Sequence, residues 1–200
     1  MSEIHYPGGV SPKGEMPRKT ATKKKRTLKI QAGNRGMGFE AEINQSNEYY
    51  KEKGLAVFSK RPTPINIVKV DYTRGAKITE AYFETQSTTD YNGVYRGRYV
   101  DFEAKSIHGK TSFPLSNIPK QQIDHLKAIL AQGGIGFFLI DIIPLDKVYM
   151  LPASFVIEFY EKRERASIPL SEFDIHGKEV PQKYRPRYDF LPLIDELFLK

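Results

Sequence analysis

The chain has 200 residues, no cysteine and a formal net charge of +7, and its length fits one well-cored domain. The lack of cysteine excludes disulfides, thiolate metal ligands and a thiol nucleophile, so that any metal must be held by oxygen or imidazole. No apolar run reaches the length of a membrane-spanning helix, and we expect a soluble, cytoplasmic protein.

The excess positive charge lies at the start of the chain. Residues 1–36 hold nine Lys or Arg and two Glu, whereas the other residues hold 22 of each sign. Residues 1–33 are rich in Pro, Gly and Lys and have no apolar periodicity, which predicts a disordered basic arm ahead of a folded domain at 34–200. Contact with nucleic-acid phosphates and a solubilising tail are equally good interpretations of such an arm.

The next elements are a helix and a hairpin. Apolar side chains at helical spacing predict a helix over 36–53 that ends at Gly54. After a short β-type run, the two prolines of 60–64 allow neither a helix nor a central strand. Alternation over 65–83 with a turn near Arg74-Gly75 predicts a β-hairpin. The segment 60–83 is a candidate projecting arm, although a solvated hairpin face is the commoner meaning of its cations, which are Lys60, Arg61, Lys69, Arg74 and Lys77.

The second half of the chain alternates between strands and helices. The Asn92-Gly93 dipeptide predicts a tight turn, and a strand follows over 98–105 with Asp101, Glu103 and Lys105 on one face. Further elements are predicted as a helix from Pro119 to about Gln132, a covered strand at 136–143, a strand at 147–151, a helix at 153–165 and a last helix capped by Asp189. This order predicts an α/β fold with a mixed central sheet flanked by helices.

Three side chains suggest a hydrolytic site. Glu103 and Lys105 are about 6 to 7 Å apart along one strand face, so a metal-held phosphate could contact both. Cleavage of a phosphodiester needs charge neutralisation, and Mg²⁺ prefers carboxylate oxygens. Asp90 is the candidate second acid. Taken singly, Asp90 is more often a turn residue, and Glu103 with Lys105 is better interpreted as an exposed cross-strand pair.

Longer motifs carry a family resemblance. The stretches KRPTP (60–64), EAYFETQSTTD (80–90), YNGVYRGRYVDFEAK (91–105) and TSFPL (111–115) together resemble the RecU family of the PD-(D/E)xK nuclease superfamily. The resemblance runs from about residue 34 to the C-terminus and implies a restriction-endonuclease-like core with the hairpin as a projecting stalk. It implies catalytic roles for Asp90, Glu103 and Lys105.

The resemblance also implies a metal site and DNA contacts. The implied metal-site residues are Thr88, Asp90, Glu103 and Gln122, with Gln121 as the alternative to Gln122. It gives Asp101 no ligand role, so we expect the Asp101 side chain either behind the metal ligands or in solvent. His125, one helical turn from Gln122, is the one histidine expected near the site. Candidate phosphate contacts are Arg35 and the cations of 60–83, namely Lys60, Arg61, Lys69, Arg74 and Lys77.

The implied function is a Mg²⁺-dependent endonuclease, with Mn²⁺ as an alternative ion, that resolves four-way (Holliday) DNA junctions by symmetric nicking in recombination and repair. Symmetric nicking implies a homodimer, and the strand-exchange recombinase is a candidate partner. A second hypothesis is a non-catalytic accessory protein that binds junctions and modulates that recombinase. A third is a related nuclease that acts on linear duplex DNA.

Overall fold

The computed structural model describes residues 32–84 and 88–199, with the side chains of 32–37 left out. Helix α1 (Ala32–Glu52) starts four residues before the predicted helix. The predicted basic arm lies outside the described residues except for its last two positions. No helix in the described part of the chain is both long and apolar enough to cross a membrane.

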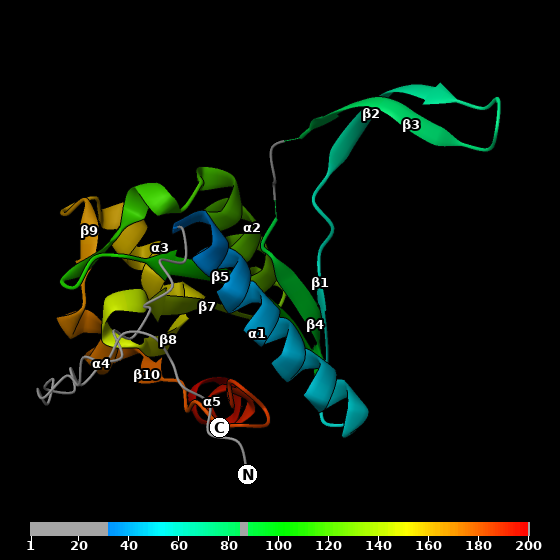
Figure 1. The fold of residues 1–200 in the computed structure, drawn as a ribbon. Helices are drawn as coiled ribbons and strands as arrows, with labels where there is room; N and C mark the ends of the chain where they lie inside the picture. Colours follow the sequence, from blue (N-terminus) through cyan, green and yellow to red (C-terminus); the bar gives the residue numbers. More distant parts are fainter. Residues whose placement is uncertain (1–31, 85–87, 200) are drawn as a thin grey trace, which may run out of the picture. The chain divides into compact units, whose positions relative to one another are not determined.

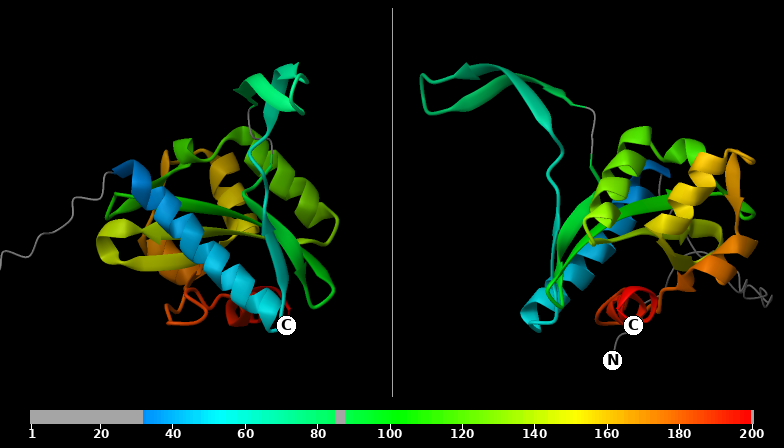
Figure 2. Two further views of the ribbon diagram at one scale, coloured as in Figure 1. Left: turned by 45° about the vertical axis from the view of Figure 1, so that its right-hand side comes forward. Right: turned by 180° about the vertical axis from the view of Figure 1, so that it is seen from behind.

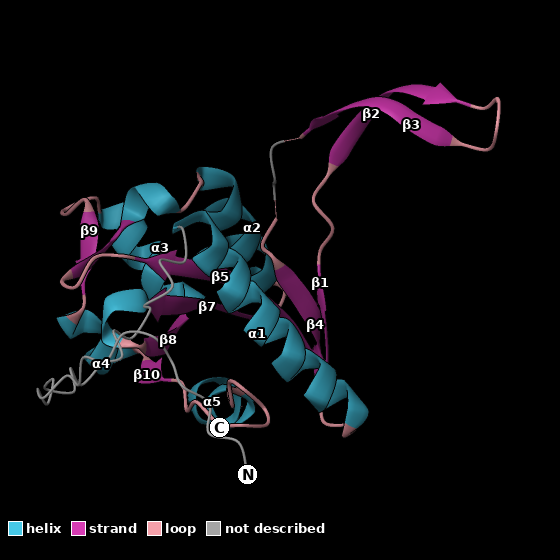
Figure 3. Cartoon of the chain, in the orientation of Figure 1, coloured by secondary structure: helices cyan, strands magenta, loops and turns pink. Residues whose placement is uncertain are grey.

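A six-stranded mixed sheet forms the centre of the fold (Figures 1 and 3). Its strands lie in the order β1 (Val57–Lys60), β4 (Tyr91–Tyr95), β5 (Arg98–Ile107), β7 (Ile135–Ile142), β8 (Lys147–Pro152) and β10 (Lys178–Glu179). Only β5 and β7 are parallel; the other neighbours are antiparallel. The parallel step requires a crossover, which contains helix α2 (Lys120–Ala131).

Each face of the sheet is covered by helices, as the views in Figure 2 show. Strand β7 is buried on both faces: Phe137 and Leu139 belong to one core, and Phe138 and Ile140 to the other. The first core is completed by α1 and by α5 (Leu191–Phe198). The second is completed by α2, α3 (Ala153–Lys162) and α4 (Ser171–His176), beside the small sheet of β6 (Ser112–Pro114) and β9 (Ser167–Pro169). The predicted fold class, a mixed sheet between helices, is confirmed.

Of three predicted helix boundaries, the structure confirms one, shortens one and contradicts one. Helix α1 ends before Gly54, whose φ of 65° is left-handed, as predicted. Helix α3 ends at Lys162 rather than 165, because Arg163 has a φ of 52°. The predicted cap at Asp189 is wrong: α5 begins after Phe190 without a side-chain cap, and the Asp189 carboxylate instead accepts a hydrogen bond from Lys183 Nζ at 2.6 Å.

The predicted turn at Asn92-Gly93 is also wrong. Both residues lie inside β4, and the tight turn between β4 and β5 is made by Arg96 and Gly97, with φ angles of 49° and 73°. Gly93 is required by packing between strands. A Cβ at this position would lie 2.8 Å from Phe58 Cα and would overlap the Val57 carbonyl oxygen on β1.

A separate two-stranded hairpin stands away from the main sheet (Figures 1 and 2). Its strands are β2 (Ile65–Asp71) and β3 (Lys77–Phe83), and nearly all of their residues are exposed. The hairpin predicted over 65–83 is confirmed, but the first residues of the projecting arm predicted at 60–83 lie outside it. Lys60 lies in β1 of the main sheet, and Arg61 lies in the segment between β1 and β2.

We expect Gly93→Ala to lower the free energy of unfolding by about 3 kcal/mol, because the new methyl group must push β1 away from β4. Urea unfolding measures this change. Gly38→Ala is the matched control: it adds the same methyl group to α1, where nothing lies within 4 Å of the new atom, and it should stabilise the protein by up to about 1 kcal/mol. Equal effects of the two substitutions would contradict this account of Gly93.

Candidate active site

The β4–β5 ladder brings Asp90 to Glu103. Tyr91, the first residue of β4, pairs with Phe102 in antiparallel register. Asp90, which precedes Tyr91, therefore lies beside Glu103, which follows Phe102. The Asp90 backbone N–H donates a hydrogen bond to Glu103 Oε2 at 2.9 Å. Asp90 Oδ2 in turn accepts one from the Ala104 backbone N–H at 3.2 Å. The two acids are thus fixed against each other by main-chain groups.

Glu103 is at the centre of the cluster. Its side chain is 1% exposed, and Oε1 lies 2.6 Å from Lys105 Nζ and accepts a hydrogen bond from Gln122 Nε2 at 2.8 Å. Gln122 is buried on the sheet-facing side of α2, whereas Gln121 is exposed. The structure therefore brings together Asp90, Glu103, Lys105 and Gln122, and it excludes an exposed Glu103–Lys105 pair.

The environment disfavours a negative charge on Glu103. Burial, and then the nearby Asp90 carboxylate, raise the pKa of Glu103 from its ordinary value of 4.5 to about 7, against the opposing effects of Lys105 and Gln122. Two close carboxylates with one ammonium leave excess negative charge. A cation placed between the acids would relieve it.

The donor set fits a hard divalent cation. Within the described ranges, no group of three or more His, Asp or Glu side chains could hold a metal, so carboxylates alone do not complete a site. Gln122 Oε1, however, is buried and has no hydrogen-bond partner among the described residues. Mg²⁺ takes few protein ligands and keeps several waters. Two carboxylates and an unpartnered amide oxygen are compatible with such an ion.

A second cluster lies beside the first and was largely missed by the sequence analysis. Asp101 is fully buried and forms an ion pair with Arg61, with Nη2 2.6 Å from Oδ2. Its other partners are Thr89, Tyr99 and His125. Burial acts to raise the pKa of Asp101, but the hydrogen bonds from Arg61 and Thr89 more than offset it and leave this pKa lowered.

Of the two predicted positions of the Asp101 side chain, behind the metal ligands or in solvent, the second is wrong, because the side chain has no exposed area. The prediction that His125 lies near the site is confirmed, since its Nε2 is 3.1 Å from Asp101 Oδ2. The available signal was the spacing of Gln122 and His125, which places both on one face of α2.

The remaining predicted residues are placed as follows. Thr88 is half-buried, and no hydrogen bond joins it to the cluster among the described residues. Lys60 is ion-paired with Glu40. Arg35 lies in α1, among the residues 32–37 whose side chains the structure does not describe. Three hairpin cations are exposed and form no ion pair in the described part of the chain: Lys69, Arg74 and Lys77.

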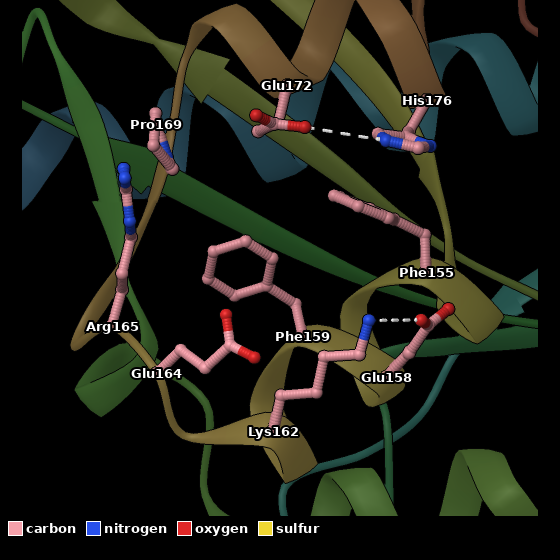
Figure 4. Close-up of a pocket in the computed structure, with 9 residues that line it drawn as sticks. All are labelled: Phe155, Glu158, Phe159, Lys162, Glu164, Arg165, Pro169, Glu172 and His176. Atoms are coloured by element: carbon pink, nitrogen blue, oxygen red, sulfur yellow. Dashed lines mark ion pairs between the residues drawn. The ribbon is translucent and has the colours of Figure 1, made fainter.

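A pocket of about 330 Å³ lies elsewhere, against α3 and α4 (Figure 4). Two ion pairs line it, Lys162 with Glu158 at 2.6 Å and His176 with Glu172 at 3.4 Å. None of the predicted site residues lines this pocket. The cluster around Glu103 is therefore the candidate active site.

These features define a class of protein: a mixed α/β fold that carries a partly buried carboxylate–lysine cluster on a central strand. Residues 34–196 match the family model RecU, described as "Recombination protein U". The chain belongs to the RecU family.

Curated relatives named Holliday junction resolvase RecU are similar over most of their length. The protein from Geobacillus kaustophilus is 44% identical and covers 98% of each chain. That from Leuconostoc citreum is 47% identical over 98% of this chain and 97% of its own. Among solved structures, Hjc, a Holliday junction resolvase from Archaeoglobus fulgidus, matches with a TM-score of 0.43 and 11% identity over 72% of this chain and 91% of that one.

We expect Glu103 to make the stability of the metal-free protein pH-dependent. The folded protein keeps the Glu103 proton up to about pH 7, whereas the unfolded chain releases it near 4.5. The associated stability is present below pH 4.5 and is lost as the pH rises to 7, in total about 3 kcal/mol, because one pKa unit corresponds to about 1.4 kcal/mol.

Urea unfolding in EDTA between pH 4.5 and 8 tests this expectation. In Glu103→Gln, which cannot titrate at this position, the free energy of unfolding should not show this decrease with rising pH. Glu161→Gln, which removes an exposed carboxylate from α3, should show the same pH dependence as the native protein. Parallel pH curves for the native protein and Glu103→Gln would contradict the assignment.

Proposed function

We propose that this protein is a structure-selective endonuclease that resolves four-way DNA junctions by symmetric, Mg²⁺-dependent nicking during recombination and repair. The observation that carries the proposal is the buried Glu103 carboxylate, in contact with Asp90, Lys105 and Gln122 at once. The names of the curated relatives, Holliday junction resolvase RecU, support the substrate.

In the proposed mechanism, Asp90, Glu103 and Gln122 Oε1 would hold a divalent ion, Mg²⁺ or alternatively Mn²⁺, together with Thr88. Such an ion would supply a Lewis acid for water activation and would neutralise charge on the phosphate. The Lys105 side chain is 22% exposed, so its ammonium can reach a bound phosphodiester while Glu103 holds it. There it orients the attacking water or stabilises the charge that develops on the phosphate oxygens.

DNA is bound through phosphates rather than through base edges. We propose that the exposed hairpin cations Lys69, Arg74 and Lys77 contact the backbone of the branched substrate, so that selectivity comes from junction shape. The basic arm at 1–33, attached to a nuclease domain at 34–200, adds phosphate contacts in the same way.

Symmetric nicking further implies two active sites related by a two-fold axis. The proposed assembly is accordingly a homodimer, and the proposed partner in recombination is the strand-exchange recombinase.

Cleavage of a labelled four-way junction tests the catalytic assignment. With Mg²⁺ the native protein should produce paired nicks at symmetric positions, and with EDTA none. Asp90→Asn and Lys105→Ala should each reduce the cleavage rate by about 100-fold or more, as expected for groups that act on the transition state, while the junction dissociation constant stays within about twofold.

Lys127→Ala is the control, because it removes an exposed lysine of α2 that pairs with Glu161. Junction binding without any Mg²⁺-dependent nicking by the native protein would support the accessory hypothesis instead. Equal cleavage rates on junction and linear duplex would support the third hypothesis.

The hairpin contacts predict a change in salt dependence. Lys69→Ala, Arg74→Ala and Lys77→Ala combined should make the slope of log affinity against log salt shallower by about 5 in the proposed homodimer, because both hairpins lose three phosphate contacts and each contact accounts for about 0.9. Fluorescence anisotropy with a labelled junction measures the slope.

The matched control removes three cations that are ion-paired elsewhere, at Lys147, Lys178 and Lys183. It should leave the slope within about one unit of the native value. An unchanged slope for the hairpin variant would remove the hairpin from the proposed interface.

A further inference from the structure

Three elements of the chain contribute residues both to the candidate active site and to a neighbouring set of side chains. The segment before β4 contributes Asp90 to the site and Thr89 to this second set. Strand β5 contributes Glu103 to the site and Asp101 to the second set. Helix α2 contributes Gln122 and His125 in the same way. We call Arg61, Thr89, Asp101 and His125 the support cluster.

Asp101 holds the support cluster together. Its Oδ1 accepts a hydrogen bond from the Thr89 hydroxyl, and its Oδ2 lies 3.1 Å from His125 Nε2. Asp101 is two residues from Glu103 on the same face of β5. The three elements that build the active site are therefore joined a second time, one to three residues along the chain from Asp90, Glu103 and Gln122.

Arg61 joins this cluster to the hairpin. Its guanidinium spans Asp101, with Nη1 at 3.4 Å from Oδ1 and Nη2 at 2.6 Å from Oδ2. Nη1 also donates to the Thr89 carbonyl at 3.1 Å and to the Thr89 hydroxyl at 2.6 Å. The remaining donor of Nη2 reaches the Tyr99 hydroxyl at 2.9 Å.

The main chain at Arg61 contacts the catalytic segment directly. The Arg61 backbone N–H donates to the Asp90 carbonyl at 2.7 Å. Arg61 lies on the leg that leads from β1 into the hairpin, and Asp90 lies on the leg that returns from it. The two segments are thus hydrogen-bonded to each other at the residue that supplies the first acid of the site.

We propose that Arg61 and Asp101 are positioning residues: this buried ion pair fixes the segment 89–90 against β5 and so sets the place of the Asp90 carboxylate. The inference rests on the proposed nuclease function. It also reverses the prediction that Arg61 contacts phosphate, because both of its Nη groups already donate within the protein and its side chain is only 19% exposed.

Arg61→Lys and Asp101→Asn test the proposal on the full-length protein. A lysine keeps the charge but not the planar fork that contacts both oxygens. At saturating junction and Mg²⁺, the single-turnover cleavage rate should fall about 10- to 100-fold, the penalty for a catalytic group misplaced by a fraction of an ångström to an ångström. The junction dissociation constant and its salt slope should not change.

The control for loss of an arginine fork is Arg187→Lys, at a partly exposed pair with Glu42 away from the cluster. Its cleavage rate should equal that of the native protein. If Arg61→Lys instead weakens junction binding, lowers the salt slope and leaves the saturated rate unchanged, Arg61 is a phosphate contact and the proposal is overturned.

Replacing both members of the ion pair by apolar side chains distinguishes a positioning role from a role in stability. Replacing a buried ion pair by apolar side chains often preserves the fold, so Arg61→Met combined with Asp101→Leu should unfold at a urea concentration near the native one. Thr89 and His125 nevertheless lose their common partner, so cleavage should stay as low as in Arg61→Lys. Recovery of the native rate in this stable pair would show that the ion pair serves stability alone.

A readout independent of cleavage is hydrogen exchange of the Asp90 backbone amide, which donates to Glu103. In the metal-free protein without DNA, Arg61→Lys should speed this exchange about tenfold, because local opening becomes easier. Unchanged exchange would overturn the positioning role. If exchange is faster in Arg61→Lys but the native protein cleaves no junction, the positioning of Asp90 stands and the nuclease proposal alone is refuted.

Discussion

Burial of the Glu103 carboxylate is the constraint on which the rest of the site depends. A carboxylate with 1% exposure must be hydrogen-bonded or lose its charge. Its partners are the Asp90 backbone N–H, the Lys105 ammonium and the Gln122 amide. They come from the segment before β4, from β5 itself and from α2. One buried acid therefore requires the correct register of two strands and the correct rotation of a helix.

Strand β5 can meet this requirement because its two faces have different tasks. Val100, Phe102 and Ala104 pack into the core beneath α1 and α5, which anchors the strand through apolar burial. The opposite face, toward α2, is then free to carry Asp101 and Glu103. Apolar packing on one side stabilises the strand enough to tolerate two buried carboxylates on the other, and each of these acids has a cationic partner.

The sequence predicted what local patterns determine. Alternation over 98–105 was enough to place Glu103 and Lys105 on one face and to suggest Asp90 as the second acid, and the family resemblance added Gln122. Contacts between distant residues were not predictable in this way. Asn92-Gly93 is a typical turn dipeptide, yet the glycine serves close contact with β1. Arg61 resembled the other cations of its segment, because its partner Asp101 lies 40 residues further along the chain.

The cations of 60–83 are divided by whether a buried carboxylate lies within reach. Arg61 is held by Asp101 and takes part in building the site, whereas Lys69, Arg74 and Lys77 remain exposed on strands and a turn that add nothing to either core. Among the described residues, the segment that enters the hairpin and the segment that follows it are hydrogen-bonded from the Arg61 N–H to the Asp90 carbonyl. Because Asp90 is also the first acid of the candidate active site, the main chain that leads into the hairpin is hydrogen-bonded to the residue that supplies this acid.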